Sequence, residues 1–249
     1  MVRKESLHRQ VVRHLALRIL HGEFSLLPNE ADLCQQLKIS RPILREAIKV
    51  LSAKGLLTVG PKTGTRVRPR RDWNLLDPQL LEWQAENGIE EHFFHNVCEI
   101  RSIIEPKAAE LAALRANEED LVEIQAAWQQ MCTNAQEVEA FITADLWFHN
   151  AIMEASHNEL LYQVVSVSSV ALRTSRALST KAPRAISSSL PIHRKVFEAI
   201  QCHDSTAARQ AMEKLIKMAT GQIAKALDYS AHRTTREQQK FSPRLEGRH

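Results

Sequence analysis

The sequence is short of glycine and cysteine and has no long apolar run, and each shortage excludes a class of protein. Only 7 of its 249 residues are glycine, and none lies between Gly88 and Gly221. No segment approaches the ~20 apolar residues of a membrane span, and the N-terminus lacks the apolar core of a signal peptide. No pattern repeats at a fixed period, which argues against a helical-repeat array. These absences predict a cytoplasmic protein without a membrane partner.

The four cysteines are too scattered to form a recognisable site. They contain no C-x-x-C pair, which argues against a disulfide framework or a thiolate zinc site. All four stand in helix-like contexts, so we expect reduced thiols in the protein core. The residues are Cys34, Cys98, Cys132 and Cys202.

Length and charge indicate two domains whose net charges have opposite signs. A chain of 249 residues exceeds one typical domain, and 44% hydrophobic residues can build real cores. Residues 1–71 hold 15 Lys and Arg against 5 Asp and Glu, a net +10. Since the whole chain carries +4, the remainder carries about −6 (4 minus 10). A basic module tethered to an acidic one is typical of a protein whose first domain alone binds a polyanion.

Residues 27–51 have the pattern of two short helices joined by a tight turn. Asn29 can cap the first helix and Ser40 the second. The second helix has one apolar stripe, formed by Leu44, Ala47, Ile48 and Leu51. Its opposite face presents Arg41, Pro42, Arg45 and Lys49. A buried back with cations near the N-terminus is typical of a helix that reads the major groove of DNA, with an ordinary solvated basic face as the alternative.

The next residues predict a β-hairpin that completes a winged helix. The β-rich runs 55–59 and 65–67 flank a turn rich in glycine and proline. The tip of this hairpin carries Lys62, Thr63 and Gly64, which suit a close approach to a phosphate backbone. Helix, helix-turn-helix and basic-tipped hairpin weaken the alternative of an ordinary basic face.

These motifs resemble the DNA-binding domain of the GntR family of bacterial transcription regulators. The matching residues are Gly22-Glu-Phe24, Leu27-Pro-Asn-Glu30, Ser40-Arg41, Arg45-Glu-Ala47, Leu51, Gly55-Leu56 and Gly64-Thr-Arg-Val67. Because a single recognition helix covers too few base pairs to be specific, we expect a homodimer that binds an inverted repeat in double-stranded DNA. Many members carry Arg directly after the Leu-Pro-x-Glu motif, where it helps to read bases. Here that residue is Ala31, so the sequence preference cannot be transferred as a whole.

The rest of the chain is predicted to be almost entirely helical. Residues 72–90 are expected to form a helical linker, in which Asp77 caps a helix that starts at Pro78. Trp73 and Trp83 are expected to pack it onto neighbouring helices. Residues 91–228 predict an all-α antiparallel bundle with helices at 91–116, 118–134, 136–156, 158–178, 187–203 and 205–228. Residues 229–249 are basic and poor in apolar residues, and we expect them to be disordered.

A second chemical pattern lies inside this bundle. Asp145 and His149 are four residues apart, so both project from one helix face and can bind one ion. His193, on a later helix, can supply a third ligand. Asp-x-x-x-His pairs also occur by chance. From the residues alone, a simple Asp–His hydrogen bond is therefore favoured over a metal site.

The C-terminal region resembles the FCD effector domain found in the FadR-like branch of the GntR family. The matching residues are Glu99 to Pro106, Ala108, Ala109, Ala112, Ala113, Asp145 to Ile152, Ala155 to Asn158, His193, Ala199 and Ile200. The resemblance implies that Asp145, His149 and His193 hold a divalent cation, for which zinc, nickel and manganese are suitable. It also implies that this cation and Arg101 hold the carboxylate of a small organic acid.

Three further positions refine this expectation. Arg173 and Asn158 are candidate effector-binding residues, with an interhelical ion pair and a helix cap as their respective alternatives. Family members with a full metal site carry another His on the last helix, and the spacing places Leu215 there. Three protein ligands then leave coordination positions open. The Trp73-Asn-x-Leu-Asp77 segment, the missing His and Arg173 resemble regulators of sugar-acid catabolism.

The sequence thus predicts a mostly α protein with a winged helix-turn-helix at 1–71 and an FCD-type bundle. Its expected function is repression of a sugar-acid or organic-acid operon, relieved by a small carboxylate effector. The alternative is a metal-dependent enzyme that uses the Asp145, His149 and His193 site. An enzyme needs a general base or nucleophile beside the metal, and the bundle has no repeated Glu-x-x-His pair.

Overall fold

The chain forms two compact units, residues 1–89 and residues 90–249. The computed structural model describes residues 6–60, 63–86, 91–167, 173, 180 and 185–240. Across these residues helices dominate, and one two-stranded antiparallel sheet accompanies them. The predicted fold class, a winged helix-turn-helix followed by an all-α bundle, is confirmed. Among the helices of the described part, none has the length and apolar character that a membrane span requires.

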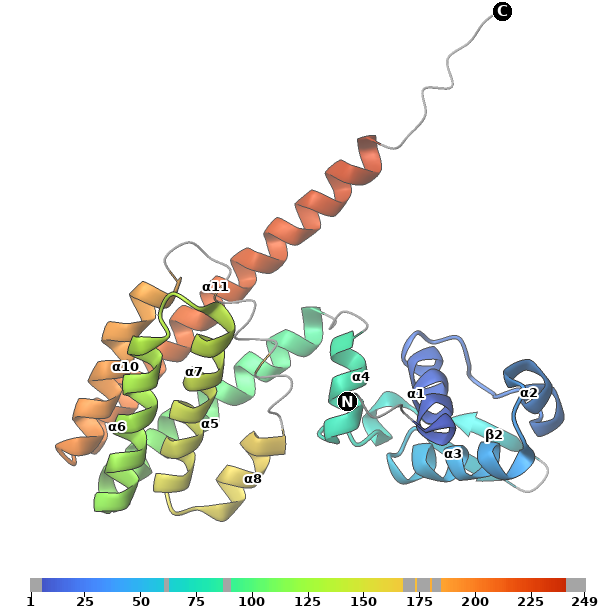
Figure 1. Ribbon diagram of the computed structural model, residues 1–249, viewed down its shortest axis with the longest axis horizontal. Coiled ribbons are helices and arrows are strands. Elements are labelled where there is room, and N and C mark those ends of the chain that lie inside the picture. Colours follow the sequence, from blue (N-terminus) through green and yellow to red (C-terminus); the bar gives the residue numbers. More distant parts are fainter. Residues whose placement is uncertain are drawn as a thin grey trace, which may run out of the picture. The chain divides into compact units, whose positions relative to one another are not determined.

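The first unit is built around the two predicted helices of the helix-turn-helix. Helix α1 (Leu7–Leu20) packs on α3 (Arg41–Ala53), and α2 (Glu30–Leu37) packs on α3 from another side. Figure 1 shows these helices beside the hairpin. Burial of leucines from all three helices and from the start of the hairpin holds the unit together. Those with at most 1% exposure are Leu15, Leu33, Leu44, Leu51 and Leu56.

The hairpin consists of β1 (Leu57–Gly60) and β2 (Gly64–Val67). The two strands pair from Leu57 opposite Val67 to Gly60 opposite Gly64. The segment before α2 adds to the outer edge of β2, because the amide of Leu27 donates to the Thr65 carbonyl at 2.9 Å. The amide of Val67 donates in turn to the Ser25 carbonyl at 3.0 Å. These bonds fix the wing against the body of the first unit.

The two predicted helix caps have different outcomes. The side chain of Asn29 accepts a hydrogen bond from the amide of Asp32 at 3.0 Å, so the cap on α2 is confirmed. Ser40 stands at the N-cap of α3 with an extended backbone, but its hydroxyl makes no capping bond. The first turn of α3 contains Pro42, which has no N–H to satisfy. The prediction that the Ser40 side chain caps the helix is therefore wrong.

The predicted linker belongs to the first unit. Its helix α4 (Pro78–Glu86) follows a short 3-10 turn, η1 (Arg70–Asp72). Asp77 caps α4 by accepting from the amide of Leu80 at 3.1 Å, as predicted. Trp83 is buried in the core of the first unit, and Trp73 packs against the same core. The ammonium of Lys54 lies 2.7 Å from Asp77 and 5.6 Å from the centre of the Trp83 ring. Residues 72–86 are thus an integral part of the first unit, which we call the head.

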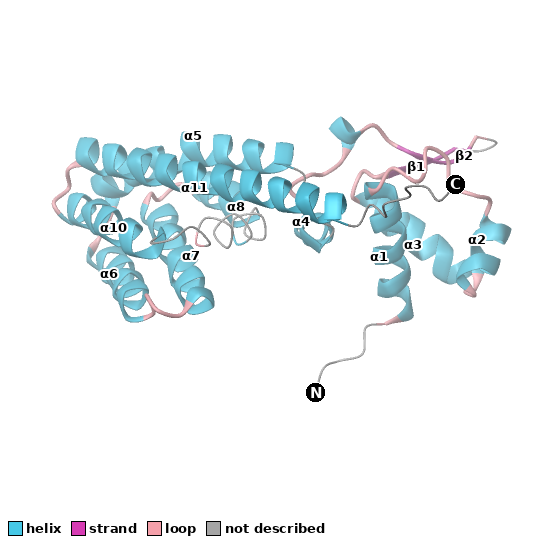
Figure 2. Ribbon diagram, turned by 90° about the horizontal axis from the view of Figure 1, so that it is seen from above, coloured by secondary structure: helices cyan, strands magenta, loops and turns pink. Residues whose placement is uncertain are grey.

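The second unit is the predicted bundle. Its described helices are α5 (Glu91–Arg115), α6 (Glu118–Thr133), α7 (Val138–Ala155), α8 (Glu159–Val167), α10 (Ala185–Gln201) and α11 (Ser205–Lys240). Helix α5 packs against α7 and α11, α10 packs against α11, and α6 packs against α7 (Figures 1 and 2). Small side chains on α5 allow close helix approach, and four of them are completely buried: Ala108, Ala109, Ala112 and Ala113.

Several helix ends differ from the prediction. The described part of α8 runs to Val167, and the remainder of the helix predicted to reach 178 lies outside the described residues except for Arg173, as does the predicted break at Pro183. Helix α11 continues to Lys240, although we predicted its end at 228 and a disordered tail from 229. Residues 229–240 contain neither glycine nor proline, and many of them are good helix formers. A helix that is already packed can therefore continue through them. Residues 241–249 lie outside the described part.

The cysteines are less buried than the sequence suggested. All four are free thiols, which agrees with the absence of a disulfide framework. Only Cys98 is buried, Cys34 is half-buried, and Cys132 and Cys202 are exposed. The two exposed thiols lie at or just beyond the ends of α6 and α10, where helices reach the surface. The expectation of four core thiols is wrong for these two.

Candidate functional site

The basic face of α3 is exposed, and its apolar stripe is buried. Leu44, Ala47, Ile48 and Leu51 all face the core of the head. Arg41 and Pro42 form the exposed first turn of the helix. The side chain of Arg41 makes no hydrogen bond or ion pair with any residue that the structure describes. The guanidinium at the start of α3 is thus available to a ligand from solvent.

Arg45, one turn further along, is held by a carboxylate from the preceding helix. Its Nε lies 3.2 and 3.1 Å from the two carboxylate oxygens of Glu30, and its Nη2 lies 3.0 Å from Oε2. This hydrogen bonding to Glu30 raises the pKa of Arg45 above its ordinary value. Lys49 is paired with Glu46 at 2.7 Å on the same exposed face. Glu30 therefore sets the direction of the Arg45 side chain, which the sequence pattern did not reveal.

The structure describes only part of the predicted tip of the wing. Thr63 and Gly64 are exposed at the turn between the strands. Gly64 has a φ of +74°, a left-handed backbone that favours glycine. Lys62 lies outside the described residues. The tip therefore offers a glycine and a small hydroxyl side chain, a shape that allows another backbone to approach closely.

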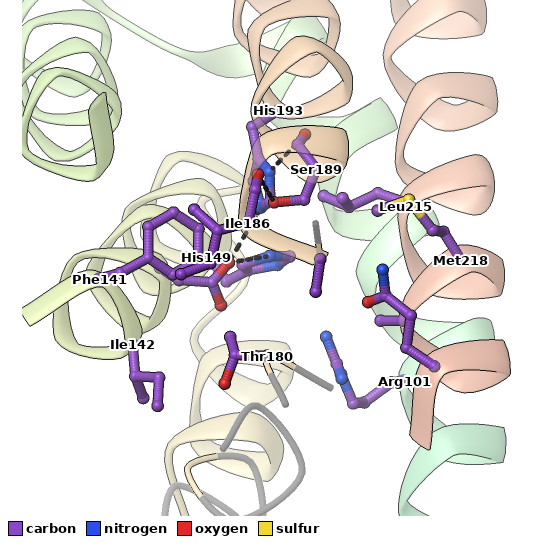
Figure 3. A pocket seen from close by; sticks show the side chains of 14 residues that line it. Arg101, Phe141, Ile142, His149, Thr180, Ile186, Ser189, His193, Leu215 and Met218 are labelled. Carbon is purple, nitrogen blue, oxygen red and sulfur yellow. Dashed lines mark hydrogen bonds and ion pairs between the residues drawn. The ribbon is translucent and has the colours of Figure 1, made fainter. Parts of the chain in front are cut away.

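A buried polar cluster lies in the middle of the second unit, where four helices meet. Asp145 and His149 come from α7, His193 from α10 and Arg101 from α5. All four side chains line a cavity of about 30 Å³ (Figure 3). Leu215, on α11, lines the same cavity and is 3% exposed. The folded chain thus brings together the three predicted metal ligands, the predicted carboxylate clamp and the position of the missing His.

The two histidines direct their Nε2 atoms toward Asp145. Nδ1 of His193 donates to the Ser189 carbonyl at 2.9 Å, and a carbonyl can only accept. The Nε2 lone pair of neutral His193 therefore faces Oδ1 of Asp145 at 3.0 Å. Nδ1 of His149 lies 2.6 Å from Oε2 of Glu105, which favours a proton on Nδ1, and Nε2 lies 3.9 Å from Oδ1 of Asp145. Three electron-pair donors converge on one small region.

This arrangement fits a divalent cation. One ligand atom from each of Asp145, His149 and His193 lies within 4.8 Å of the others. Ligand atoms that share an ion at about 2.1 Å are roughly 3.0–3.4 Å apart, so only a small contraction is needed. Nε2 of His193 makes no well-aligned hydrogen bond with any described residue, which is costly for a buried nitrogen. Each imidazole also has an oxygen beside its other nitrogen, the usual support of a metal-binding histidine.

Among the described residues that line the cavity, Arg101 is the only strong cation. It is 5% exposed, and its Nε donates to Oε1 of Glu105 at 2.6 Å. Burial opposes its charge, but the carboxylates of Glu105 and Asp145 outweigh that effect and hold the pKa of Arg101 above its ordinary value. Figure 3 shows the side chain reaching into the cavity. A guanidinium that is always charged and lines a cavity is suited to binding a carboxylate.

Two predicted effector residues are not brought to this cavity. Arg173 is exposed, and its Nη2 lies 3.6 Å from Oε2 of Glu139 and 3.5 Å from Oγ1 of Thr143. It therefore forms the interhelical ion pair that was its alternative. Asn158 accepts from the amide of Leu161 at 3.2 Å and so caps the start of α8. Neither residue lines the cavity, because local ion-pair and capping partners hold both side chains elsewhere.

Sequence reasoning missed the buried carboxylate of Glu105, which contacts both Arg101 and His149. Its signal was present, because Glu105 stands four residues after Arg101 and so on the same helix face. Ser189, Thr180 and Gln222 also line the cavity. His203 lies at the turn after α10, where its Nδ1 donates to the Ala113 carbonyl at 2.9 Å. It is not among the described residues that line the cavity, so it does not replace the missing ligand.

Comparisons with known proteins find matches for both units of the chain. Residues 7–67 match the family model described as bacterial regulatory proteins, gntR family, and residues 96–218 match the FCD domain. The chain is 35% identical over 222 residues to the galactonate operon transcriptional repressor of Escherichia coli (strain K12), covering 86% of this chain and 95% of that protein. It is 31% identical over 223 residues to the HTH-type transcriptional regulator YieP of the same strain, covering 86% and 94%.

A solved structure with the same fold is that of Lar, described as controlling the expression of the Listeria monocytogenes agr system. It has a TM-score of 0.59 and 20% identity, and covers 90% of this chain and 99% of that one. The enzyme alternative has no support among these relatives, and the protein is a DNA-binding transcription regulator. The chain belongs to the GntR family of bacterial regulatory proteins and carries an FCD domain behind its DNA-binding head.

Proposed function

We propose that this regulator represses a sugar-acid operon and leaves its operator when a small hydroxy-carboxylate binds the FCD domain. The observation that carries the proposal is the cavity shared by Arg101, Asp145, His149 and His193. A carboxylate clamp and a cation site on one cavity are suited to an acid with a neighbouring hydroxyl group. The similarity to a galactonate operon repressor supports a sugar acid as the class of effector.

The head is proposed to read DNA as one half of a homodimer on an inverted repeat. A single recognition helix covers too few base pairs to be specific, so two-fold pairing is expected. In this proposal Arg41 and Arg45 contact base edges or adjacent phosphates, and Pro42 and Lys49 lie along the same face of α3. Lys62, Thr63 and Gly64 hold the wing on the phosphate backbone. The protein is proposed to act in the cytoplasm, where its operator lies.

A divalent cation, for which zinc, nickel and manganese are candidates, is proposed to bind Asp145, His149 and His193. When bound, it would supply positive charge and open coordination positions for an oxygen of the effector. Among the described residues, the buried charged side chains around the site are Asp145, Glu105 and Arg101, which sum to −1 (−2 plus 1). A divalent cation makes the sum +1 (−1 plus 2). One carboxylate then makes it zero, so the buried charges favour a monocarboxylate over a dicarboxylate.

The size of the cavity supports a way in which the effector acts at a distance. A volume of about 30 Å³ has room for one or two water molecules but not for a hexonate. We propose that a sugar acid binds a form of the domain in which the walls of this cavity have moved apart. A ligand that prefers this wider form shifts the protein toward it. We propose that the wider form is the one with low affinity for the operator.

The proposal is tested on DNA taken from the chain's own upstream region. Fluorescence anisotropy would measure DNA binding by the parent protein with D-galactonate, D-gluconate, L-lactate and succinate added in turn. The expected result is binding at an inverted repeat and release by a sugar acid, with little release by the dicarboxylate. Release that is equally strong with succinate would contradict the monocarboxylate assignment. Release that survives complete chelation would remove the cation from the mechanism.

A further inference from the structure

One carboxylate holds both halves of the proposed ligand site. Glu105, on α5, is 1% exposed. Its Oε1 lies 2.6 Å from Nε of Arg101, and its Oε2 lies 2.6 Å from Nδ1 of His149. Glu105 is not among the side chains that line the cavity. It stands behind the cavity wall and joins a residue proposed to hold the carboxylate to a residue proposed to hold the cation.

We infer that Glu105 is a positioning residue that couples cation binding to carboxylate binding in this domain. The inference rests on the proposed function and adds to it a mechanism of regulation. The regulator would respond to its effector strongly only when the cation is present. By thermodynamic linkage, the effector would raise the affinity for the cation by the same factor.

A purely structural role for Glu105 would not require its contact with His149. An Arg101–Glu105 pair alone would satisfy both buried charges. The second oxygen of Glu105 instead lies against the ring nitrogen opposite the proposed metal ligand atom. A carboxylate in this position fixes the ring orientation and makes Nε2 a better electron-pair donor. The ion pair and the histidine contact together place Glu105 in both halves of the site.

The direction of the coupling follows from the charges. A cation on Nε2 would draw electron density from the imidazole and so strengthen the attraction between its Nδ1 side and Oε2 of Glu105, which lies 2.6 Å from Nδ1. The carboxylate then has less negative charge to share with Arg101, and the guanidinium attracts an external carboxylate more strongly. Asp145 also acts on the charge of Arg101. Removal of the Glu105 charge should therefore weaken the coupling without abolishing it.

The first experiment measures Ni²⁺ binding to the full-length, metal-stripped protein by titration calorimetry. Glu105→Gln keeps the shape of the side chain and removes its charge. We expect the affinity for Ni²⁺ to fall about 10- to 100-fold, as for other carboxylates that support a metal-binding histidine. Glu110→Gln is the matched control, because Glu110 lies on the same helix but pairs with the surface residue Lys107. This control should bind Ni²⁺ within twofold of the parent.

A second readout separates positioning from folding. The absorption spectrum of bound Co²⁺ reports ligand geometry, so it should change in Glu105→Gln and stay unchanged in Glu110→Gln. Glu105→Asp keeps the charge and should recover part of the lost affinity. If Glu105→Gln bound Ni²⁺ as tightly as the parent with an unchanged Co²⁺ spectrum, the positioning role would be wrong. If the parent itself bound no Ni²⁺, the proposed cation site would fail first.

The coupling itself is tested by repeating the Ni²⁺ titrations with and without 10 mM D-galactonate. In the parent we expect the acid to tighten Ni²⁺ binding at least fivefold. In Glu105→Gln we expect the factor of tightening to be less than half of the factor measured in the parent. Equal tightening in both proteins would overturn the coupling role of Glu105. No tightening in the parent would instead count against the proposed effector class, while the Ni²⁺ affinities would still decide the contact with His149.

Discussion

Nε2 of His193 lies 3.0 Å from Oδ1 of Asp145, and both atoms belong to buried side chains. The other ring nitrogen of His193 donates to the Ser189 carbonyl. In the neutral imidazole, Nε2 therefore carries a lone pair, and two electron-pair donors face each other without a proton between them. A cation placed between them removes the repulsion, which is the physical reason to expect metal in this site.

The first prediction concerns metal content. Protein purified gently without chelators should carry about one divalent cation per chain, measured by mass spectrometry of the metals. His149→Ala should lose most of it, because two ligands remain and metal affinity depends on the number of ligands. His157→Ala is the control, since that histidine pairs with Asp120 at the surface. Equal metal in His149→Ala and in the parent would rule out His149 as a ligand.

The second prediction concerns the missing ligand. Leu215 lines the cavity, and Leu215→His should supply a fourth ligand and tighten Ni²⁺ binding at least tenfold. Without metal the variant should be less stable by about 1–3 kcal/mol, because a buried imidazole lacks a partner. Added Ni²⁺ should restore this loss in thermal unfolding. The gain in Ni²⁺ affinity should disappear in the double variant that combines Leu215→His with His193→Ala. Unchanged Ni²⁺ affinity would show that position 215 does not face the cation.

The third prediction concerns DNA reading by α3. Arg45→Ala should weaken binding to the specific operator roughly 5- to 150-fold at equal salt. Arg194→Ala is the control and should leave operator binding unchanged. It removes the same charge from an exposed residue of α10 that is paired with Glu198. The salt dependence of binding should become less steep in Arg45→Ala if the guanidinium contacts a phosphate, and stay the same if it contacts a base. Operator affinity equal to that of the parent would exclude Arg45 from the interface.

The fourth prediction concerns the junction between α3 and the wing. Gly55 has a φ of +79°, and a Cβ there would lie 2.5 Å from the Asp72 carbonyl oxygen. Gly55→Ala should therefore lower the free energy of unfolding of the head by more than about 2 kcal/mol. Gly22 also has a positive φ of +71°, but no atom lies within 4 Å of its added Cβ. Gly22→Ala should cost only about 1 kcal/mol in chemical denaturation. Similar losses in both variants would show that the contact with Asp72 relaxes.

Residue spacing was sufficient to predict much of this molecule. The apolar stripe formed by Leu44, Ala47, Ile48 and Leu51 predicted which face of α3 is buried. Residues three, four or seven positions apart project from the same side of a helix, so their spacing fixes the face on which they lie. Asp145 and His149 share a face for the same reason. Their meeting with His193 required a tertiary arrangement, which only the family resemblance supplied before the structure.

The features that the sequence did not predict include side-chain pairs whose partners lie outside the local pattern. Arg173 pairs with Glu139, 34 positions earlier (173 minus 139), and no spacing rule links those two residues. The same holds for Arg45 and Glu30, which sit on different helices. The prediction for α11 failed differently, since low apolar content suggested disorder although the residues themselves favour helix. Local sequence predicts elements well but not the partners of long polar side chains.

The last prediction concerns the effector clamp. Arg101→Ala would leave Glu105 buried with one partner fewer, so a loss of stability of about 3–5 kcal/mol could obscure any effect on regulation. Arg101→Lys is the sharper variant, because it keeps the charge beside Glu105 and removes the planar fork that binds a carboxylate through two bonds. We expect this variant to bind the operator like the parent but to need at least tenfold more sugar acid for release. Anisotropy titrations with operator DNA at rising D-galactonate would measure this shift. Arg209→Lys, in an exposed pair with Glu213 on α11, serves as the control and should respond like the parent. If Arg101→Lys lost operator binding instead, Arg101 would act in folding or pairing of the domain, and the clamp would be wrong.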